Sequence, residues 1–112
     1  MNKLILIGSA ASLSLLAASA GRAADAAGAW SQNCAACHGA DGGGHTKAGK
    51  MVGAKDMTDA SYQKSFTDDQ AFTAIKEGFK DASGTDKMKP FADKLSDDDI
   101  KSLVAYVRTL AK

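Results

Sequence analysis

Beyond its first 24 residues, the 112-residue chain is poor in the side chains that build a hydrophobic core. Leu, Ile, Val and Phe together make up only 12 of residues 25–112. That share is below the roughly 20% at which a chain commonly cannot fold by burial alone. Small domains of this kind are usually stabilised by disulfides, a metal or another added constraint, and only two cysteines are present. We therefore expect something other than protein to fill part of the core.

The first 24 residues have the order of a secretory signal peptide. Lys3 precedes an apolar stretch, and small residues at 17–20 suit cleavage. The alternative is an uncleaved membrane anchor, because Leu4 to Ala20 is 17 residues long and a spanning helix needs roughly 17 to 25. We favour export to a bacterial periplasm, a mature domain over residues 25–112 and no stable membrane insertion. Cleavage is expected after Ala20, Ala23 or Ala24.

The mature range is nearly neutral, with twelve basic and thirteen acidic side chains. Without a basic excess it has no electrostatic footprint for nucleic acid or for an acidic membrane surface. We therefore expect neither as a partner.

The apolar periodicity predicts helices and loops, with no strand. A first helix is expected over residues 25–35 and a helical turn over residues 58–62. The last helix should begin at Ser96 and bury a stripe of Ile100, Leu103, Val104, Val107 and Leu110. Residues 39–53, which include six glycines, and the polar residues 81–89 are expected to be loops.

A further helix is expected between residues 67 and 78. Thr67 and Gln70 fit a capping box, with two aspartates in the first turn. Gly78 is suited to end such a helix. The helical spacing then predicts one shared apolar face, formed by Phe72, Ile75 and Phe79.

The run Cys34-Ala35-Ala36-Cys37-His38 is the attachment motif for a c-type haem. Two thiols three residues apart can reach the two vinyl groups of one porphyrin, and the adjacent imidazole is then brought under the iron. A thioredoxin-like pair would need a neighbouring βαβ pattern, and a zinc site would need two more regularly spaced ligands. A simple disulfide would be strained across so short a loop.

The chain resembles the small class I c-type cytochromes over essentially all of residues 25–112. The resemblance implies an all-α fold of three or four helices around one covalently attached haem. It also implies that the first and last helices cross with Gly28 against Tyr106. The matching features are Gly28 and Trp30, the motif with Gly39, Gly78, Met88-Lys89-Pro90-Phe91, Leu95-Ser96 and the closing stretch 103–108.

Met88 is the expected sixth ligand, opposite His38 on the haem iron. It lies 50 residues beyond His38, so the chain can return on the other haem face, and Pro90 restricts its loop. The family places its axial methionine in this setting. Met51 and Met57 follow His38 by only 13 and 19 residues, which would require one segment to cross the ring. His45 is a rival ligand, although we interpret it as a solvated loop residue.

One departure from the family concerns the proline whose carbonyl accepts a hydrogen bond from the axial histidine. Where many members have Gly-Pro, this chain has Gly49-Lys50, and its only proline is Pro90. We expect a backbone carbonyl near Gly49 or Lys50 to accept that bond, in a less rigid segment.

These expectations predict a monomeric single-electron carrier with redox protein partners and no catalytic residues. The alternatives are a haem-based sensor, in which Met88 leaves the iron to a small molecule, and a dedicated electron-accepting subunit of a dehydrogenase. Lysines near the expected haem edge could steer an acidic partner. They are Lys47, Lys50, Lys55, Lys87 and Lys89, with acidic residues interleaved, and a solvated surface explains them equally well.

Overall fold

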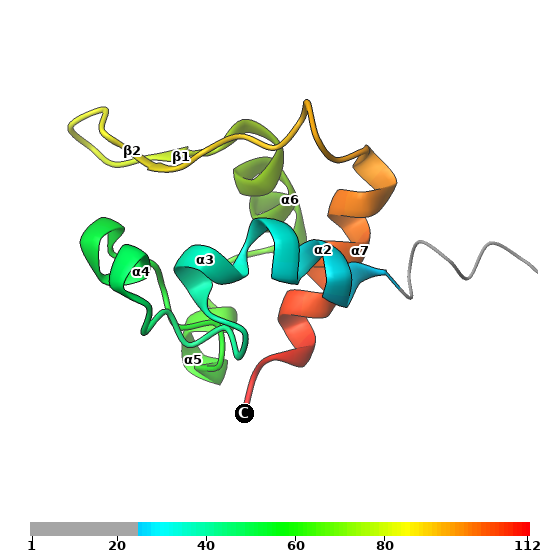
Figure 1. Cartoon of the computed structure of the whole chain (residues 1–112), viewed down its shortest axis with the longest axis horizontal. Helices are drawn as coiled ribbons and strands as arrows, with labels where there is room; N and C mark the ends of the chain where they lie inside the picture. The colour runs from blue at the N-terminus through cyan, green and yellow to red at the C-terminus, as the bar shows by residue number, and fades with distance from the viewer. Residues whose placement is uncertain (1–24) are drawn as a thin grey trace, which may run out of the picture.

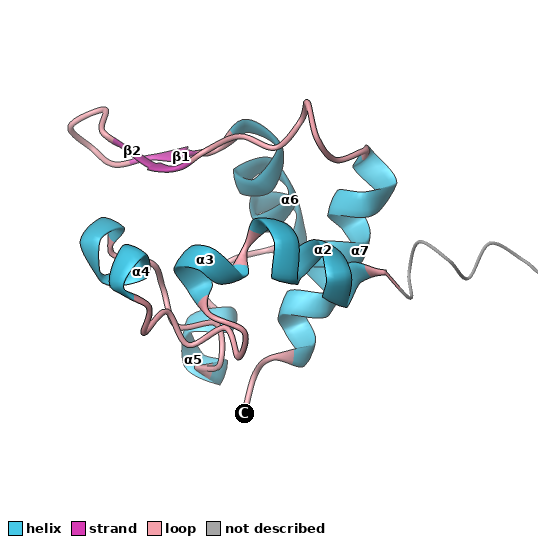
Figure 2. Cartoon of the chain, in the orientation of Figure 1, coloured by secondary structure: helices cyan, strands magenta, loops and turns pink. Residues whose placement is uncertain are grey.

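The computed structural model describes residues 25–112, and the predicted signal peptide lies outside that range. Three helices have eight or more residues: α2 (Ala26–Asn33), α6 (Asp68–Glu77) and α7 (Asp97–Thr109). Three shorter ones are α3 (Ala35–His38), α4 (Lys47–Val52) and α5 (Ala60–Gln63). The antiparallel strands β1 (Phe79–Lys80) and β2 (Asp86–Met88) form a small hairpin (Figures 1 and 2). No helix within residues 25–112 is long and apolar enough to cross a membrane.

The two capped helices begin where the sequence predicts. The Thr67 side chain accepts from the Gln70 N–H, and the Gln70 side chain accepts in return from the Thr67 N–H. Ser96 and Asp99 form the same reciprocal pair at the start of α7. Each box satisfies backbone donors that the first helical turn would otherwise leave unpaired.

The core lies between α2, α6 and α7 and is small. Its buried members are Trp30, Cys34, Ile75, Phe91, Ile100, Leu103, Val104 and Val107. Only Ile100 and Leu103 have no exposed surface. The predicted α7 stripe is confirmed, with Leu110 partly buried. The expectation that Phe79 shares the α6 face is wrong: α6 ends before Gly78, which has a positive φ, so Phe79 lies in β1 and is 55% exposed.

The structure adds two elements in segments that were expected to be loops. In the glycine-rich segment, Thr46 accepts from the Gly49 N–H and so starts α4. In the other segment, the Asp81 carboxylate accepts from the N–H groups of Ser83 and Thr85 and closes the hairpin turn. Strands of two and three residues are too short to show a polar and apolar alternation.

The expected crossing of Gly28 against Tyr106 is wrong. A Cβ added at Gly28 would meet only the Asp25 side chain within 4 Å, and no atom of α7. Trp30 instead packs on Tyr106, with ring centroids 5.7 Å apart. Ala26 and Ala29 on the same helix are buried or pack against the core. Small alanines therefore suffice for the approach of α2 to α7.

Arg108 ties the C-terminal part of α7 to the segment between α5 and α6. Its guanidinium donates to the Phe66 carbonyl at 2.8 Å and to the Gln63 carbonyl, and it lies 4.4 Å above the Phe66 ring. Gln63 is buried, and its amide donates to the carbonyls of Met57 and Val107. The bonds to the Phe66 and Val107 carbonyls join residues more than 40 positions apart in the sequence, so the two side chains hold α7 in position.

Candidate haem-binding site

The predicted attachment motif occupies the junction between α2 and α3. Cys34 ends α2, and Cys37 and His38 lie in the single turn of α3. Residues three apart in a helical turn share a face, so both thiols can bind the same group. Cys34 is buried in the core and Cys37 is half-buried, and both thiols are free. Burial raises the pKa of the Cys34 thiol to about 11.

The expected continuous helix over residues 25–35 is interrupted at this motif. Cys34 is the C-cap of α2, and its N–H donates to the Trp30 carbonyl at 2.8 Å. The Cys34 carbonyl then accepts from the His38 N–H at 2.9 Å, which starts the new turn. Trp30 contacts the His38 ring across the interruption, at a centroid distance of 5.6 Å.

The His38 imidazole is held by a backbone carbonyl. Its Nδ1 lies 3.4 Å from the Lys55 carbonyl oxygen. A carbonyl can only accept, so Nδ1 carries the proton and Nε2 keeps a free lone pair. Burial lowers the pKa of His38, an effect larger than the opposing hydrogen bond to Lys55. The ring is therefore favoured in the neutral form that can bind a metal.

The acceptor for His38 is not where the sequence placed it. We expected a carbonyl near Gly49 or Lys50, but these residues are part of α4. The Gly49 carbonyl already accepts from the N–H groups of Gly53 and Ala54. Lys55 lies beyond the helix, in an irregular segment, so its carbonyl is available. No side-chain pattern marks such an acceptor, because the group belongs to the backbone.

Backbone contacts also hold α3 against the glycine-rich segment. The Thr46 hydroxyl donates to the Cys37 carbonyl at 2.7 Å, and the Gly44 N–H donates to the His38 carbonyl at 2.7 Å. The buried Trp30 indole donates to the Gly39 carbonyl at 3.0 Å. Three consecutive carbonyls at the end of the motif are thus paired. Sequence reasoning missed Thr46, although a threonine three residues before Gly49 is an N-cap signal.

Gly49 provides the closest approach between α4 and the motif. A Cβ built there would lie 2.2 Å from the Cys37 carbonyl oxygen, closer than real atoms come. Gly49→Ala should therefore push α4 away from α3 and lower the free energy of unfolding by about 1 to 3 kcal/mol, as overpacking does. Thermal unfolding of the holoprotein measures the change. The exposed neighbour Lys50→Ala is the matched control, and equal stability of the two variants would contradict the contact.

The three methionines of the mature range occupy different environments. Met51 lies on α4 and is 77% exposed. Met57 packs against the core, and its N–H donates to the carbonyl of Gly42, in the loop that follows His38. Met88 lies in β2 opposite Phe79 and also packs against the core. The rival ligand His45 is exposed.

The groups present fit a covalently held haem. Two free thiols share one turn, an imidazole held by the Lys55 carbonyl follows them, and the surrounding core is small. A zinc site has no support, since residues 25–112 contain no group of three or more His, Cys, Asp or Glu that could hold a metal ion. A mostly helical domain with this motif defines a c-type cytochrome.

Comparison with known proteins gives the family. The chain belongs to the family described as cytochrome c oxidase, cbb3-type, subunit III, whose sequence model matches residues 21–107. Among solved structures it is similar to the KustC0563 c-type cytochrome, with a TM-score of 0.69 and 34% identity over 79% of this chain and 99% of that one. A mutant of that cytochrome gives a TM-score of 0.66 and 34% identity, with 77% and 98% covered. No curated protein sequence matches the chain.

These findings confirm the class and the fold predicted from the sequence. The protein is a small monohaem c-type cytochrome with an all-α fold. Its cofactor is haem c, which the family binds covalently and which contains iron. Small cytochromes of this kind are in general electron carriers.

Proposed function

We propose that the mature chain is an exported carrier of single electrons. Cys34 and Cys37 would hold one haem covalently, and His38 and Met88 would bind its iron. One observation carries the proposal: Cys34 belongs to the buried core cluster, and Met88, 54 residues later, packs against that same cluster from the hairpin. A haem attached to this motif would therefore lie near Met88.

The environments of the other methionines favour Met88. Met51 is too exposed to belong to a buried iron site. The Met57 N–H donates to the Gly42 carbonyl. Met57 is therefore held beside the loop that directly follows His38, the other proposed ligand. Met88 comes from a separate element. Gly78 packs closely on its carbonyl, because a Cβ there would lie 2.6 Å from the Met88 oxygen. The hairpin is thus closely packed where the proposed ligand lies.

Bound haem supplies an iron that can change between the ferrous and ferric states. The chain's own residues determine what that iron can do. His38 is oriented by Lys55, so its Nε2 can bind without losing a proton. A thioether is a soft ligand that favours ferrous iron and a relatively high reduction potential. With His38 and Met88 both bound to it, the iron would have no place for oxygen or a substrate, and outer-sphere electron transfer is the chemistry that the haem would supply.

The proposal includes redox protein partners and periplasmic localisation. The description of the matching family names an oxidase subunit, which supports an oxidase as one class of partner. The alternative role as the electron-accepting subunit of a dehydrogenase uses the same haem site, with a dehydrogenase as the electron donor. A sensor differs chemically, because its iron must open to a small molecule.

Visible spectroscopy of the purified holoprotein tests the proposal. We expect a low-spin ferric spectrum with weak red absorption from the iron–thioether bond, and a reduced form that resists carbon monoxide. Mass spectrometry should find one haem bound to residues 25–112. Immediate binding of carbon monoxide would mean an open iron and would favour the sensor instead.

A further inference from the structure

Gly44 contacts both groups that hold His38 in place. Its N–H donates to the His38 carbonyl at 2.7 Å. Its Cα lies against the segment after α4, because a Cβ added at Gly44 would be 2.8 Å from the Ala54 carbonyl oxygen and 3.2 Å from the Lys55 carbonyl oxygen. That Lys55 oxygen is the acceptor for Nδ1 of His38. Gly44 therefore links the backbone bond of His38 to its ring bond.

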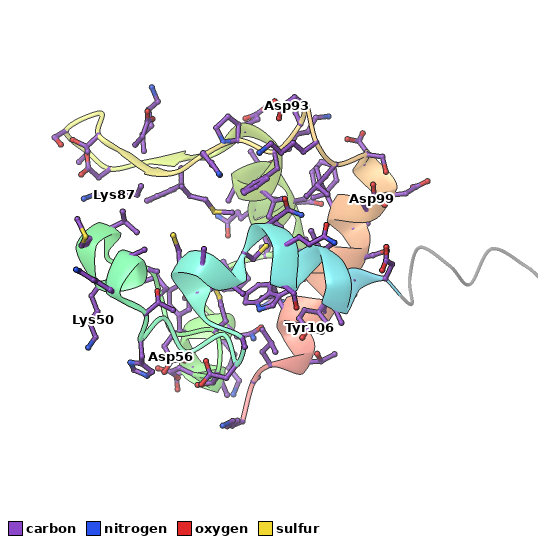
Figure 3. All side chains as sticks on the ribbon, in the orientation of Figure 1. Lys50, Asp56, Lys87, Asp93, Asp99 and Tyr106 are labelled. Atoms are coloured by element: carbon purple, nitrogen blue, oxygen red, sulfur yellow. The ribbon has the colours of Figure 1, made fainter. Side chains whose placement is uncertain are left out.

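The contact at Gly44 is part of a longer approach between two segments of the chain. The Met57 N–H donates to the Gly42 carbonyl at 2.8 Å. Two residues further along, Gly44 faces Lys55, so the two segments run antiparallel. Figure 3 labels Asp56 in this region, below α3. The bond at Gly42 fixes which residues face each other, and Gly44 then limits how near the Lys55 carbonyl can come.

Position 44 has room for glycine alone. Its φ is +75°, which side chains rarely adopt, and the nearest neighbours of a Cβ would be backbone carbonyls, which cannot rotate away as a side chain does. The bond from His38 to Lys55 is already 3.4 Å long, so a small displacement of the carbonyl would break it. If Gly44 moved back instead, its own bond to the His38 carbonyl would lengthen. Either movement loosens the proposed ligand.

The position of the Lys55 carbonyl affects the iron through the imidazole. A hydrogen bond from the second ring nitrogen makes a metal-bound imidazole more basic. A more basic ligand favours ferric over ferrous iron, so the bond to Lys55 lowers the reduction potential. The chain has no proline between His38 and Lys55 to stiffen the acceptor segment. The close approach of Gly44 restricts that segment instead.

We propose that Gly44 is a positioning residue for the axial imidazole: it fixes the Lys55 carbonyl against Nδ1 of His38, and the bond that it maintains lowers the reduction potential. The inference rests on the proposed function, because it needs His38 to bind the iron. It goes beyond a structural role, which would change stability and leave the potential unaltered.

Gly44→Ala and Gly53→Ala in the holoprotein test this assignment. The two glycines are matched, because Gly53 has a φ of +70° but no atom within 4 Å of an added Cβ. Both substitutions therefore carry similar backbone strain, and only Gly44→Ala also displaces the carbonyl. Redox titration should give a higher potential for Gly44→Ala than for Gly53→Ala or the wild type. In proton NMR of the reduced protein, the His38 ring N–H should exchange about tenfold or more faster in Gly44→Ala alone, because it loses its acceptor.

A measurement on the wild type does not depend on the folding of any variant. The Gly44 N–H and the His38 ring N–H should become exposed through one opening of the loop. Their protection against hydrogen exchange should therefore fall in parallel as denaturant is added to the reduced holoprotein.

Three results would overturn the positioning role. The first is equal potentials and equal exchange rates in the two variants. The second is a Gly44→Ala protein that is destabilised but keeps the wild-type potential. The third is independent loss of the two protections in the wild type, which decides the question even if Gly44→Ala yields no holoprotein. The carrier proposal fails separately, through rapid carbon monoxide binding by the wild type. A carbon monoxide-resistant wild type with equal variants contradicts the positioning role alone.

Discussion

Replacing both Cys34 and Cys37 with Ala is expected to leave residues 25–112 largely without helical structure. The double variant cannot attach haem, and the protein part of the core is small. Within residues 25–112 only nine apolar residues are buried, and two of these, Ala26 and Cys34, have small side chains. Burying a large apolar side chain contributes roughly 1.5 to 3 kcal/mol. So small a core offsets little of the conformational entropy that is lost on folding, and we expect the haem to complete it.

Far-ultraviolet circular dichroism of the variant and the wild-type holoprotein measures the loss. Most of the helical signal should disappear, together with the cooperative thermal transition. Ala36→Ser is the matched control, because this residue lies in the same turn but is exposed. It should keep the haem and the helices. A fully helical, cooperatively melting cysteine double variant would refute the view that the cofactor completes the core.

The features that local chemistry determines could be predicted from the sequence. Thr67 with Gln70 and Ser96 with Asp99 cap their helices through contacts three residues apart, so the pattern alone reveals them. The apolar stripe of α7 follows from the helical period in the same way. The haem motif is equally local, since Cys34, Cys37 and His38 occupy one turn.

The features that depend on packing could not be read from the same patterns. Lys55 holds His38 through a carbonyl that every residue possesses, and only the end of α4 leaves that carbonyl available. Nothing in the sequence distinguishes Gly49 from the neighbouring glycines, although Gly49 is the one that lies against the Cys37 backbone. Gly28 shows the opposite error, because the sequence pointed to a contact that the structure does not have. The family resemblance placed Gly28 against α7, but Ala26, Ala29 and Trp30 form that face of α2.

The proposed ligand Met88 gives the second large effect. Met88→Ala should open the iron to water, so the ferric spin state should rise and carbon monoxide should bind the reduced protein quickly. The reduction potential should fall, because the soft ligand that favours ferrous iron is lost. We expect a fall on the order of 100 mV, since axial ligands set haem potentials over a range of about 0.8 V. Visible spectra, carbon monoxide mixing and a redox titration provide the three measurements.

Met51→Leu and Met57→Leu are the matched controls for this substitution. Met51 is exposed and Met57 packs against the core, so swaps of similar volume should cost little at either position. Both variants should keep the red absorption band, the low-spin state and the resistance to carbon monoxide. If Met57→Leu removes the band while Met88→Ala retains it, the ligand is Met57. The hairpin would then be a packing element, although the protein would still be a c-type cytochrome.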